Sequence, residues 1–380
     1  MSDLRTIQPA SQFDIAAYFW PAYHDEPRWR PFFTGTKGEW AIIEDAVAKF
    51  PGHYQPRIPL WGFESDSDPR AMERKIDAAA SHGVNVFIFD WYWYDNAPFL
   101  EDSINEGYLK AANNDRVKFF IMWANHDAGT AWDVRRSHDP RVIWPGAVDR
   151  PVFDTIARRL TDRYLGHPSY YKIDGCPVVS IYDLNTLVAG LGGVDAARAA
   201  LDSFRSLAVR AGFPDLHLQA IQWSSIPFFL KDVTGDSPPT QDDVIEKLGF
   251  DSVTSYQWIH TAGADRTYEA WGNEVMAQWD DWRTRRFKIP YFPHVSVGWD
   301  SNPRTVAPRP IVTDGSPALF EGFLRRTRDY VLRNNLSPRL ITINSWNEWS
   351  EGSYIEPDER FGMGYLEAVK SVFLDEPGVR

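Results

Sequence analysis

Residues 68–93 read DPRAMERKIDAAASHGVNVFIFDWYW, and this stretch holds a helix and a strand in the order that decides the fold. Asp68 and Pro69 are typical of a helix N-cap and the first helical position, and the spacing predicts a helix over 71–82 that ends at Gly83. The continuous apolar run from Val84 to Asp90 predicts a strand buried on both faces. A helix that leads into such a strand is one unit of a parallel α/β sheet.

The same alternation recurs along the chain. Apolar runs predict eight strands, at Ile15–Trp20, Val84–Asp90, Val117–Trp123, Pro177–Asp183, Leu216–Trp223, Ser252–Trp258, Tyr291–Trp299 and Arg339–Trp346. Helical spacing predicts helices at about 71–82, 151–165, 194–211, 264–287, 317–335 and 364–373. This alternation predicts an α/β fold, either a (β/α)8 TIM barrel or an open doubly wound sheet.

The strand ends favour the barrel. Six predicted strands end in an aromatic residue with polar neighbours: Tyr18-Phe19-Trp20, Asp90-Trp91-Tyr92-Trp93, Trp123-Ala124-Asn125-His126-Asp127, Tyr182-Asp183, Tyr256-Gln257-Trp258 and Trp346-Asn347-Glu348. A barrel brings the carboxyl ends of all its strands to one face, where these residues would meet. No linker divides the chain. We therefore predict one barrel domain over 1–380, with long loops over the C-terminal face at 21–69, 224–249 and 300–316.

Composition and charge exclude several classes of partner. The chain has 380 residues, 43% apolar and 24% charged, with a net charge of -12 and no basic stripe, so we expect no nucleic-acid partner. No apolar run reaches the roughly 18 residues that span a bilayer, which predicts no membrane partner. The single cysteine, Cys176, and the absence of an apolar signal region predict a cytoplasmic location. Nothing in the pattern indicates the oligomeric state.

The chain is rich in aromatic residues, with 17 Trp, 16 Tyr and 23 Phe, and many of them gather at the strand ends. Aromatic rings stack on the CH face of a sugar, while carboxylates and amides bind its hydroxyl groups. The predicted partner is therefore an oligosaccharide or polysaccharide. The predicted substrate-binding residues are Tyr18, Trp20, His53, Asp90, Trp91, Trp93, Trp123, Asn125, His126, Tyr182, Tyr256, Trp299, Trp346 and Asn347.

The predicted catalytic residues are Glu348 and Glu351, which follow the eighth strand in Trp346-Asn347-Glu348-Trp349-Ser350-Glu351-Gly352. If this segment turns helically, two side chains three residues apart share one face, with Cβ atoms roughly 5–6 Å apart. Retaining glycosidases place their two carboxyl groups about 5–5.5 Å apart. Burial between tryptophans should also separate the two pKa values. We expect Glu356 to hold the loop by hydrogen bonds.

No motif predicts a metal or a cofactor. The chain has no HxH, HExxH or cysteine-containing ligand set, no GxGxxG after a strand and no GxxxxGK[ST]. Asp66-Ser67-Asp68 matches the Asp-x-Asp pattern of many glycosyltransferases, but it precedes a helix that begins with proline and is better explained as a cap.

The whole chain resembles the glycoside hydrolases typified by endo-α-1,2-mannosidase and, more closely, their WbsX-type relatives from polysaccharide gene clusters. The resemblance extends from residue 15 to about 366. It rests on Ala17-Tyr18-Phe19-Trp20-Pro21-Ala22-Tyr23, Glu39-Trp40, His53-Tyr54-Gln55-Pro56-Arg57-Ile58-Pro59, Phe87-Ile88-Phe89-Asp90-Trp91-Tyr92-Trp93, Trp346-Asn347-Glu348-Trp349-Ser350-Glu351-Gly352 and Ile355-Glu356-Pro357.

The resemblance implies a barrel hydrolase that cleaves an α-linked sugar with retention and without metal or cofactor. It implies that Glu348 is the base that acts on the substrate's own 2-hydroxyl, giving a 1,2-anhydro sugar, and that Glu351 is the general acid/base. Tyr256 would match a tyrosine that lines the subsite of bond cleavage. The mannosidases have histidine where this chain has Ser350, so either a manno- or a rhamno-configured sugar is expected.

Three alternatives stay open at this point. A direct double displacement would use carboxylates on other strands, such as Asp183 and Asp300. Glycosyl transfer in polysaccharide biosynthesis would use a nucleotide-activated sugar. A non-catalytic sugar-binding barrel would have the same aromatic residues without using the glutamates.

Overall fold

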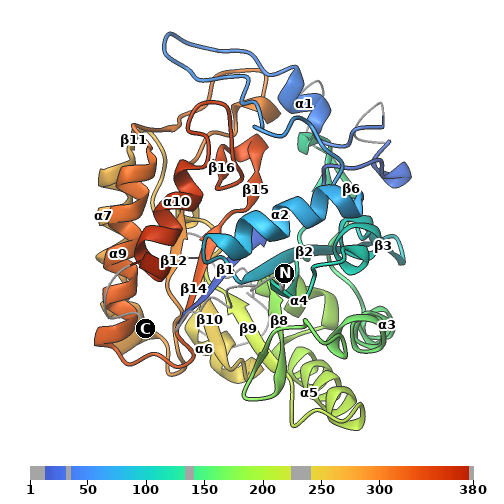
Figure 1. The fold of residues 1–380 in the computed structure, drawn as a ribbon. Helices are drawn as coiled ribbons and strands as arrows, with labels where there is room; N and C mark the ends of the chain where they lie inside the picture. The colour runs from blue at the N-terminus through green and yellow to red at the C-terminus, as the bar shows by residue number, and fades with distance from the viewer. Residues whose placement is uncertain (1–12, 31–35, 133–140, 224–240, 376–380) are drawn as a thin grey trace, which may run out of the picture.

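The computed structural model describes residues 13–30, 36–132, 141–223 and 241–375. Its main sheet contains eight parallel strands, in the spatial order β10-β9-β8-β4-β2-β1-β14-β12. Their bounds are β1 Asp14–Phe19, β2 Val86–Tyr94, β4 Lys118–Trp123, β8 Cys176–Ile181, β9 His217–Ile221, β10 Ser252–Thr254, β12 His294–Ser296 and β14 Leu340–Asn344 (Figure 1). Each of these strands overlaps a strand predicted from the sequence.

The two edge strands of this order meet, which makes the sheet a barrel. Val253 of β10 forms a parallel bridge with Tyr291, just before β12. The Val253 amide donates to the Pro290 carbonyl at 2.9 Å, and the Phe292 amide donates to the Val253 carbonyl at 2.8 Å. An open doubly wound sheet would leave these edges unpaired. The predicted TIM barrel is therefore confirmed.

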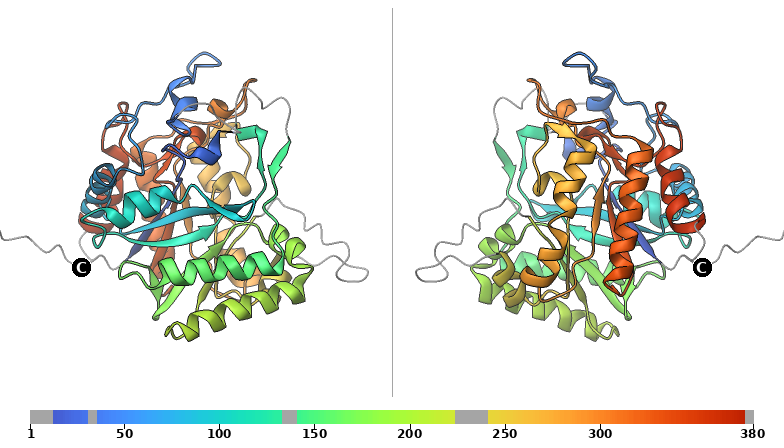
Figure 2. Two further views of the ribbon diagram at one scale, coloured as in Figure 1. Left: turned by 90° about the vertical axis from the view of Figure 1, so that its right-hand side faces the viewer. Right: turned by 90° about the vertical axis from the view of Figure 1, so that its left-hand side faces the viewer.

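Helices surround the barrel (Figure 2). They are α1 Trp40–Glu44, α2 Pro69–Ser81, α3 Arg150–Leu160, α4 Leu184–Leu191, α5 Val194–Arg210, α6 Gln241–Leu248, α7 Tyr268–Met276, α8 Trp279–Asp281, α9 Pro317–Arg333 and α10 Gly364–Lys370. Helix α2 begins as predicted, because the Arg70 amide donates to the Asp68 side chain at 2.9 Å with Pro69 in the first turn. Asp68 is thus a cap.

The helix predicted over 264–287 is wrong in its extent. Arg266–Thr267 forms the short strand β11, which pairs with β13, Val312–Thr313. The Thr267 side chain then accepts from the Ala270 amide, so α7 starts only at Tyr268. Helix α8 and the π-turn Trp282–Arg286 complete the segment. Pairing with a distant loop overrides the local helical pattern.

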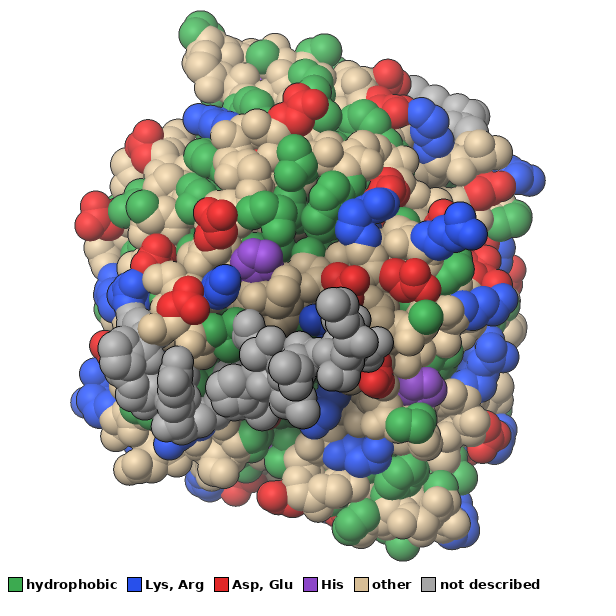
Figure 3. Space-filling view, in the orientation of Figure 1, with side chains coloured by type: hydrophobic (Ala, Val, Ile, Leu, Met, Phe, Trp, Pro, Cys, Tyr) green, Lys and Arg blue, Asp and Glu red, His purple; other side chains and the backbone are tan. Residues whose placement is uncertain are grey.

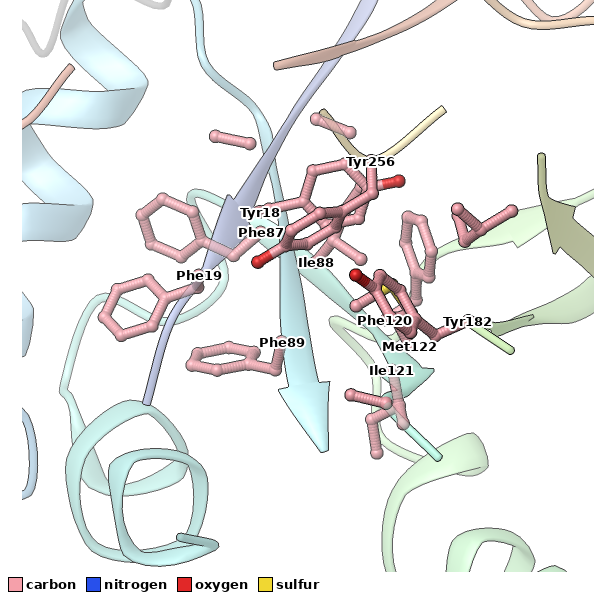
Figure 4. Packing of buried hydrophobic residues seen from close by; sticks show 14 of the residues in the cluster. Tyr18, Phe19, Phe87, Ile88, Phe89, Phe120, Ile121, Met122, Tyr182 and Tyr256 are labelled. Carbon is pink, nitrogen blue, oxygen red and sulfur yellow. The ribbon is translucent and has the colours of Figure 1, made fainter. Parts of the chain in front are cut away.

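Strand β2 is buried along its whole length, and its side chains alternate between the barrel interior and the surrounding helices. Phe87 and Phe89 face outward, toward Trp346 and Tyr108 respectively. Inside the barrel, the rings of Tyr18, Tyr182 and Tyr256 pack edge to face (Figure 4). These tyrosines form the floor above which the candidate site lies.

Two predicted insertions meet over the C-terminal face. The first, 21–69, includes α1, and the last, 300–316, includes the 3-10 turn Asn302–Arg304. The Lys49 ammonium joins them by donating to the Asn302 carbonyl at 2.6 Å and to Thr305. Of the third insertion, 224–249, residues 224–240 lie outside the described residues.

Among the helices of the described ranges, none combines the length and the apolar character that a membrane span requires.

Candidate active site

Glu348 and Glu351 lie in a hairpin just past β14. Strand β15, Asn347–Glu348, pairs with β16, Ser353–Tyr354, and the 3-10 turn Trp349–Glu351 connects them. In a 3-10 turn, side chains three residues apart eclipse one another. The two glutamates therefore point to the same side, as the helical spacing of the motif predicts.

The hairpin is fixed from behind. The Trp349 indole donates to Glu356 at 2.8 Å and stacks on Tyr354, with ring centroids 3.7 Å apart. Glu356 also pairs with the buried Lys75 at 2.7 Å, so its predicted role in holding the loop is confirmed. The Asn347 side chain binds the Trp20 backbone, accepting from its amide at 2.7 Å and donating to its carbonyl at 2.9 Å. The turn that carries the glutamates is thus tied to the end of β1.

A single arginine joins the two glutamates. Arg304 donates from Nη2 to Glu348 at 2.8 Å, from Nη1 to Glu351 at 2.8 Å and from Nε to Glu39 at 2.8 Å. Its guanidinium lies over the Trp20 ring, 5.4 Å from the centroid. The Trp20 indole also donates to Glu39 at 2.5 Å. One cation therefore holds three carboxylates at the mouth of the barrel.

A tyrosine joins Glu348 to a third acidic residue of the cavity. The Tyr256 hydroxyl lies 3.0 Å from Glu348 Oε2 and 2.8 Å from Asp90 Oδ2. Asp90 comes from β2, Tyr256 follows β10 and Glu348 follows β14, so three separate strand ends converge at this point. The convergence of strand ends that the barrel predicts is observed here.

Burial dominates the electrostatics of the two glutamates. Glu348 is 2% exposed, while the Glu351 side chain is 16% exposed. Burial, followed by the negative charge of Glu351, raises the pKa of Glu348 well above its usual range, and Arg304 opposes this shift. Burial also raises the pKa of Glu351, again against Arg304. Two close carboxyl groups in this setting favour a state in which they hold one proton between them.

The glutamates open onto a cavity of about 310 Å³. Such a volume lies near the lower end of the range for small-molecule sites. Its lining combines carboxylates, one guanidinium and many rings. The lining residues are Trp20, Asp90, Tyr92, Met122, Ala124, His126, Trp132, Tyr182, Trp223, Tyr256, Arg304, Glu348 and Glu351. Burial lowers the pKa of His126, which favours its neutral form.

Seven predicted site residues line this cavity: Trp20, Asp90, His126, Tyr182, Tyr256, Glu348 and Glu351. Four others support it from behind. Tyr18 packs under Tyr256 and donates to the Ser255 carbonyl at 3.1 Å. Asn125 bonds with the Asp183 backbone at 2.7 and 2.8 Å, and Asn347 holds Trp20 as described above. Trp346 is fully buried against Phe87, on the helix side of the barrel wall.

The other five predicted residues point elsewhere. Trp91 donates to Glu101 at 2.7 Å outside the barrel, and Trp93 stacks on Trp91. Trp123 packs on Phe153 of α3. His53 binds Asp300 at 2.9 Å, while Trp299 is half-buried against the core. Side chains in a strand alternate between its two faces, so Trp91 and Trp93 cannot share the cavity with Asp90.

The residues of the alternative mechanism also have other partners. Asp183 caps α4, accepting from the Thr186 amide at 3.0 Å. Asp300 accepts from His53, Gln55 and Asn302 and pairs with Arg57 at 3.3 Å. Burial would raise the pKa of Asp300, but Arg57 and these hydrogen bonds outweigh it and lower the pKa to about 2. Neither aspartate lines the cavity.

Sequence reasoning missed the residue that organises the site, Arg304. It lies in the predicted rim loop 300–316, where an isolated arginine gives no signal of its partners. For Glu39 the sequence indicates only a place in the family motif Glu39-Trp40. Tyr92 could have been predicted, because it lies two residues after Asp90 in the same strand and therefore on the same face. The other lining residues that went unpredicted are Met122, Ala124, Trp132 and Trp223.

Comparison with known proteins places these features in context. A family model described as "Glycosyltransferase WbsX" matches residues 15–369. Two proteins named WxcX, described as uncharacterized, from two strains of Xanthomonas campestris pv. campestris are each 27% identical over 375 residues. The match covers 96% of this chain and 50% of each relative, so the chain spans about half the length of the curated relatives it matches.

Solved structures share the fold. A structure titled "Glycoside hydrolase-like protein" is 17% identical and has a TM-score of 0.65, covering 98% of this chain and 97% of its own. The GH99 endo-alpha-mannosidase from Bacteroides thetaiotaomicron in complex with bis-tris-propane is 14% identical, with a TM-score of 0.56 and 96% of both chains covered. A second structure of that mannosidase is 15% identical, with a TM-score of 0.54, and covers 94% of this chain and 95% of its own. At these identities the likeness shows a common barrel.

Proposed function

This chain belongs to the family described as "Glycosyltransferase WbsX". We propose that it is a retaining glycoside hydrolase acting on an α-linked manno- or rhamno-configured sugar of a polysaccharide or oligosaccharide. The observation that carries the proposal is the pair Glu348 and Glu351, held on one guanidinium at the wall of an aromatic cavity. The shared fold with an endo-alpha-mannosidase supports it.

In the proposed first step, Glu348 takes the proton of the substrate's 2-hydroxyl. The freed oxygen attacks the anomeric carbon, and Glu351 gives its proton to the leaving oxygen as the glycosidic bond breaks. The product of this step is a 1,2-anhydro sugar. Glu348 accepts from both Arg304 and Tyr256, whereas Glu351 accepts from Arg304. These donors oppose the burial that raises the pKa of Glu348, so Glu348 can act as the ionised base while Glu351 carries the proton.

In the second step, Glu351 takes a proton from water as that water attacks the anomeric carbon. The epoxide opens and its oxygen recovers the proton from Glu348, which restores the 2-hydroxyl and both starting protonation states. Two inversions at one carbon give net retention. The depths of the glutamates suit these roles, because the more exposed Glu351 is the one that must reach the leaving group and the water.

Aryl α-mannosides, aryl α-rhamnosides and α-linked manno-oligosaccharides test the proposal. Proton NMR during hydrolysis should show the α-anomer of the released sugar first. Release of the β-anomer first would contradict retention. No release from any of these substrates or from bacterial polysaccharides would contradict hydrolysis on sugars of this class.

Glycosyl transfer is a second candidate, which the family description favours. A nucleotide-sugar donor would bring a diphosphate toward Asp90, Glu348 and Glu351. The cation among the cavity residues that the structure describes, Arg304, is already paired with three carboxylates. Such a site repels a polyanion, so we expect nucleoside diphosphates not to raise the melting temperature. A rise would favour transfer.

A further inference from the structure

The Tyr256 hydroxyl lies between two carboxyl groups and cannot serve both as a donor. It is 2.8 Å from Asp90 and 3.0 Å from Glu348, both of which are ordinary hydrogen-bond lengths. A phenol has one hydrogen to donate, and its oxygen can also accept. If both carboxylates were ionised, one of these contacts would set a lone pair of the hydroxyl against an anion. Both contacts are satisfied when one carboxyl group carries a proton and donates it to Tyr256.

The surroundings of the two carboxyl groups decide where that proton lies. Glu348 accepts a charge-assisted hydrogen bond from Arg304 at 2.8 Å, which stabilises its ionised form. Asp90 is 2% exposed, and within the described chain the charge that acts on it is that of Glu351, another carboxylate, with no lysine or arginine beside it. Its second oxygen, Oδ1, is buried with no hydrogen-bond partner within that part of the chain. An ionised carboxylate is costly in such a place.

We propose that Asp90 is an un-ionised carboxylic acid at neutral pH that donates to Tyr256, which in turn donates its own hydrogen to Glu348. Burial acts in the same direction, since it raises the pKa of Asp90 well above its usual range despite the hydrogen bond with Tyr256. The titratable and charged groups that face Asp90 or share its cavity are Tyr18, Tyr92, His126, Tyr182, Tyr256, Arg304, Glu348 and Glu351.

The consequence for catalysis rests on the proposed function. With Asp90 neutral, the Tyr256 hydrogen points to Glu348 and stabilises it as the ionised base. With Asp90 ionised, the same hydrogen would turn to Asp90 and leave Glu348 without this donor. Asp90 is thus a positioning residue that acts on the base through Tyr256.

The pH dependence of stability tests the protonation state without a substrate. A group whose pKa is raised on folding makes the native chain less stable as pH rises above the unfolded value of about 4. In Asp90→Asn the amide can donate to Tyr256 but does not ionise. The melting temperature of Asp90→Asn minus that of the native chain should therefore rise between pH 4.5 and 8, by about 2 °C per pH unit. A difference that stays flat or falls would overturn the proposal.

Asp300→Asn is the matched control, because the pKa of Asp300 is lowered on folding and its carboxylate is ionised in this range. Its difference in melting temperature should stay constant between pH 5 and 8. Infrared difference spectra of native protein against Asp90→Asn at pH 7, or against Asp90→Ala if the amide variant does not fold, should show the carbonyl band of an un-ionised acid. A carboxylate band would overturn the proposal. Failure of every glycoside assay would refute the proposed hydrolysis and leave these results standing.

Discussion

Asp300 and Arg304 are four residues apart in the same loop, but their surroundings differ in the balance of charges and hydrogen-bond donors. Asp300 is one anion surrounded by donors from His53, Gln55, Arg57 and Asn302. Arg304 is one cation surrounded by three carboxylates. The donors around Asp300 balance the charge of its carboxylate and fix the shape of the loop. The carboxylates around Arg304 leave excess negative charge at the cavity, where proton transfer is proposed to occur.

The pKa values reflect this difference. That of Asp300 is held at about 2, while those of Glu348 and Glu351 are raised by burial and that of Glu348 also by the charge of Glu351. A carboxylate that accepts from several donors stays ionised through the physiological pH range, whereas two carboxyl groups that lie close together can exchange a proton near neutrality. Burial alone therefore does not identify a reactive carboxyl group. The two regions differ in the number of donors per carboxylate: Asp300 has several, whereas three carboxylates share the guanidinium of Arg304.

The largest effect is expected from the glutamates themselves. Glu348→Gln and Glu351→Gln should each lower kcat by about 10³-fold or more, because each removes a proton transfer from the reaction. Steady-state assays on an aryl α-glycoside that the native chain cleaves provide the measurement. Glu359→Gln, which alters an exposed glutamate a few residues further on, is the control and should keep the native rate. Near-native rates in both cavity variants would refute their assignment.

The second effect concerns the cation. Arg304→Gln should lower kcat/KM by about 10²-fold, since it removes a positive charge from both glutamates. Their pKa values should rise further, so the acidic limb of the pH–rate profile should move to higher pH. Arg304→Lys keeps the charge but loses the forked geometry, and we expect a smaller shift of the limb. An unchanged limb in the glutamine variant would show that Arg304 does not control the protonation of the pair.

Tyr256→Phe should have a smaller effect, of about tenfold on kcat, because it removes one hydrogen bond to Glu348. The loss of this donor raises the pKa of the base, so the acidic limb should again shift upward. The profile of kcat/KM against pH is the measurement. A rise in KM with no movement of the limb would assign Tyr256 to substrate binding only.

The smallest effect on catalysis should come from the satisfied region. Asp300→Asn should lower the free energy of unfolding by about 3 kcal/mol, by breaking a buried ion pair, with kcat changed less than in the three preceding cases. Because the folded pKa is below the unfolded value of about 3.9, this stability is present above pH 4 and is lost as pH falls toward 2. Chemical denaturation at pH 7 and pH 3 should show the difference shrinking.

The sequence predicts the barrel well because its signal is local. Each strand is a short apolar run, and features such as Asp68-Pro69 mark helix ends without help from the rest of the chain. The failure over 264–287 has a non-local cause, the pairing of β11 with β13. The pair Glu348 and Glu351 was found for the same local reason, since three-residue spacing defines a common face.

Arg304 could not be predicted in its role, because its partners are 44, 47 and 265 residues away in the chain. No local pattern records such contacts. Trp91 and Trp93 illustrate a different limit. Their aromatic character suggested the cavity, yet the two-residue period of a strand, which was available from the sequence, selects Asp90 and Tyr92 instead.

The hydrogen bonds from Lys49 to the backbone of Asn302 and Thr305, which link the first insertion to the loop around Arg304, have a consequence for protein engineering. Loops on a barrel rim are usually exchanged between relatives as independent parts. Here a graft of residues 21–69 or 300–316 from another protein would also replace Arg304, the counter-ion of the proposed catalytic pair, or the lysine that anchors its loop. Altered substrate choice in such chimeras would have to be separated from a change in proton affinity, and the two loops should be transplanted together.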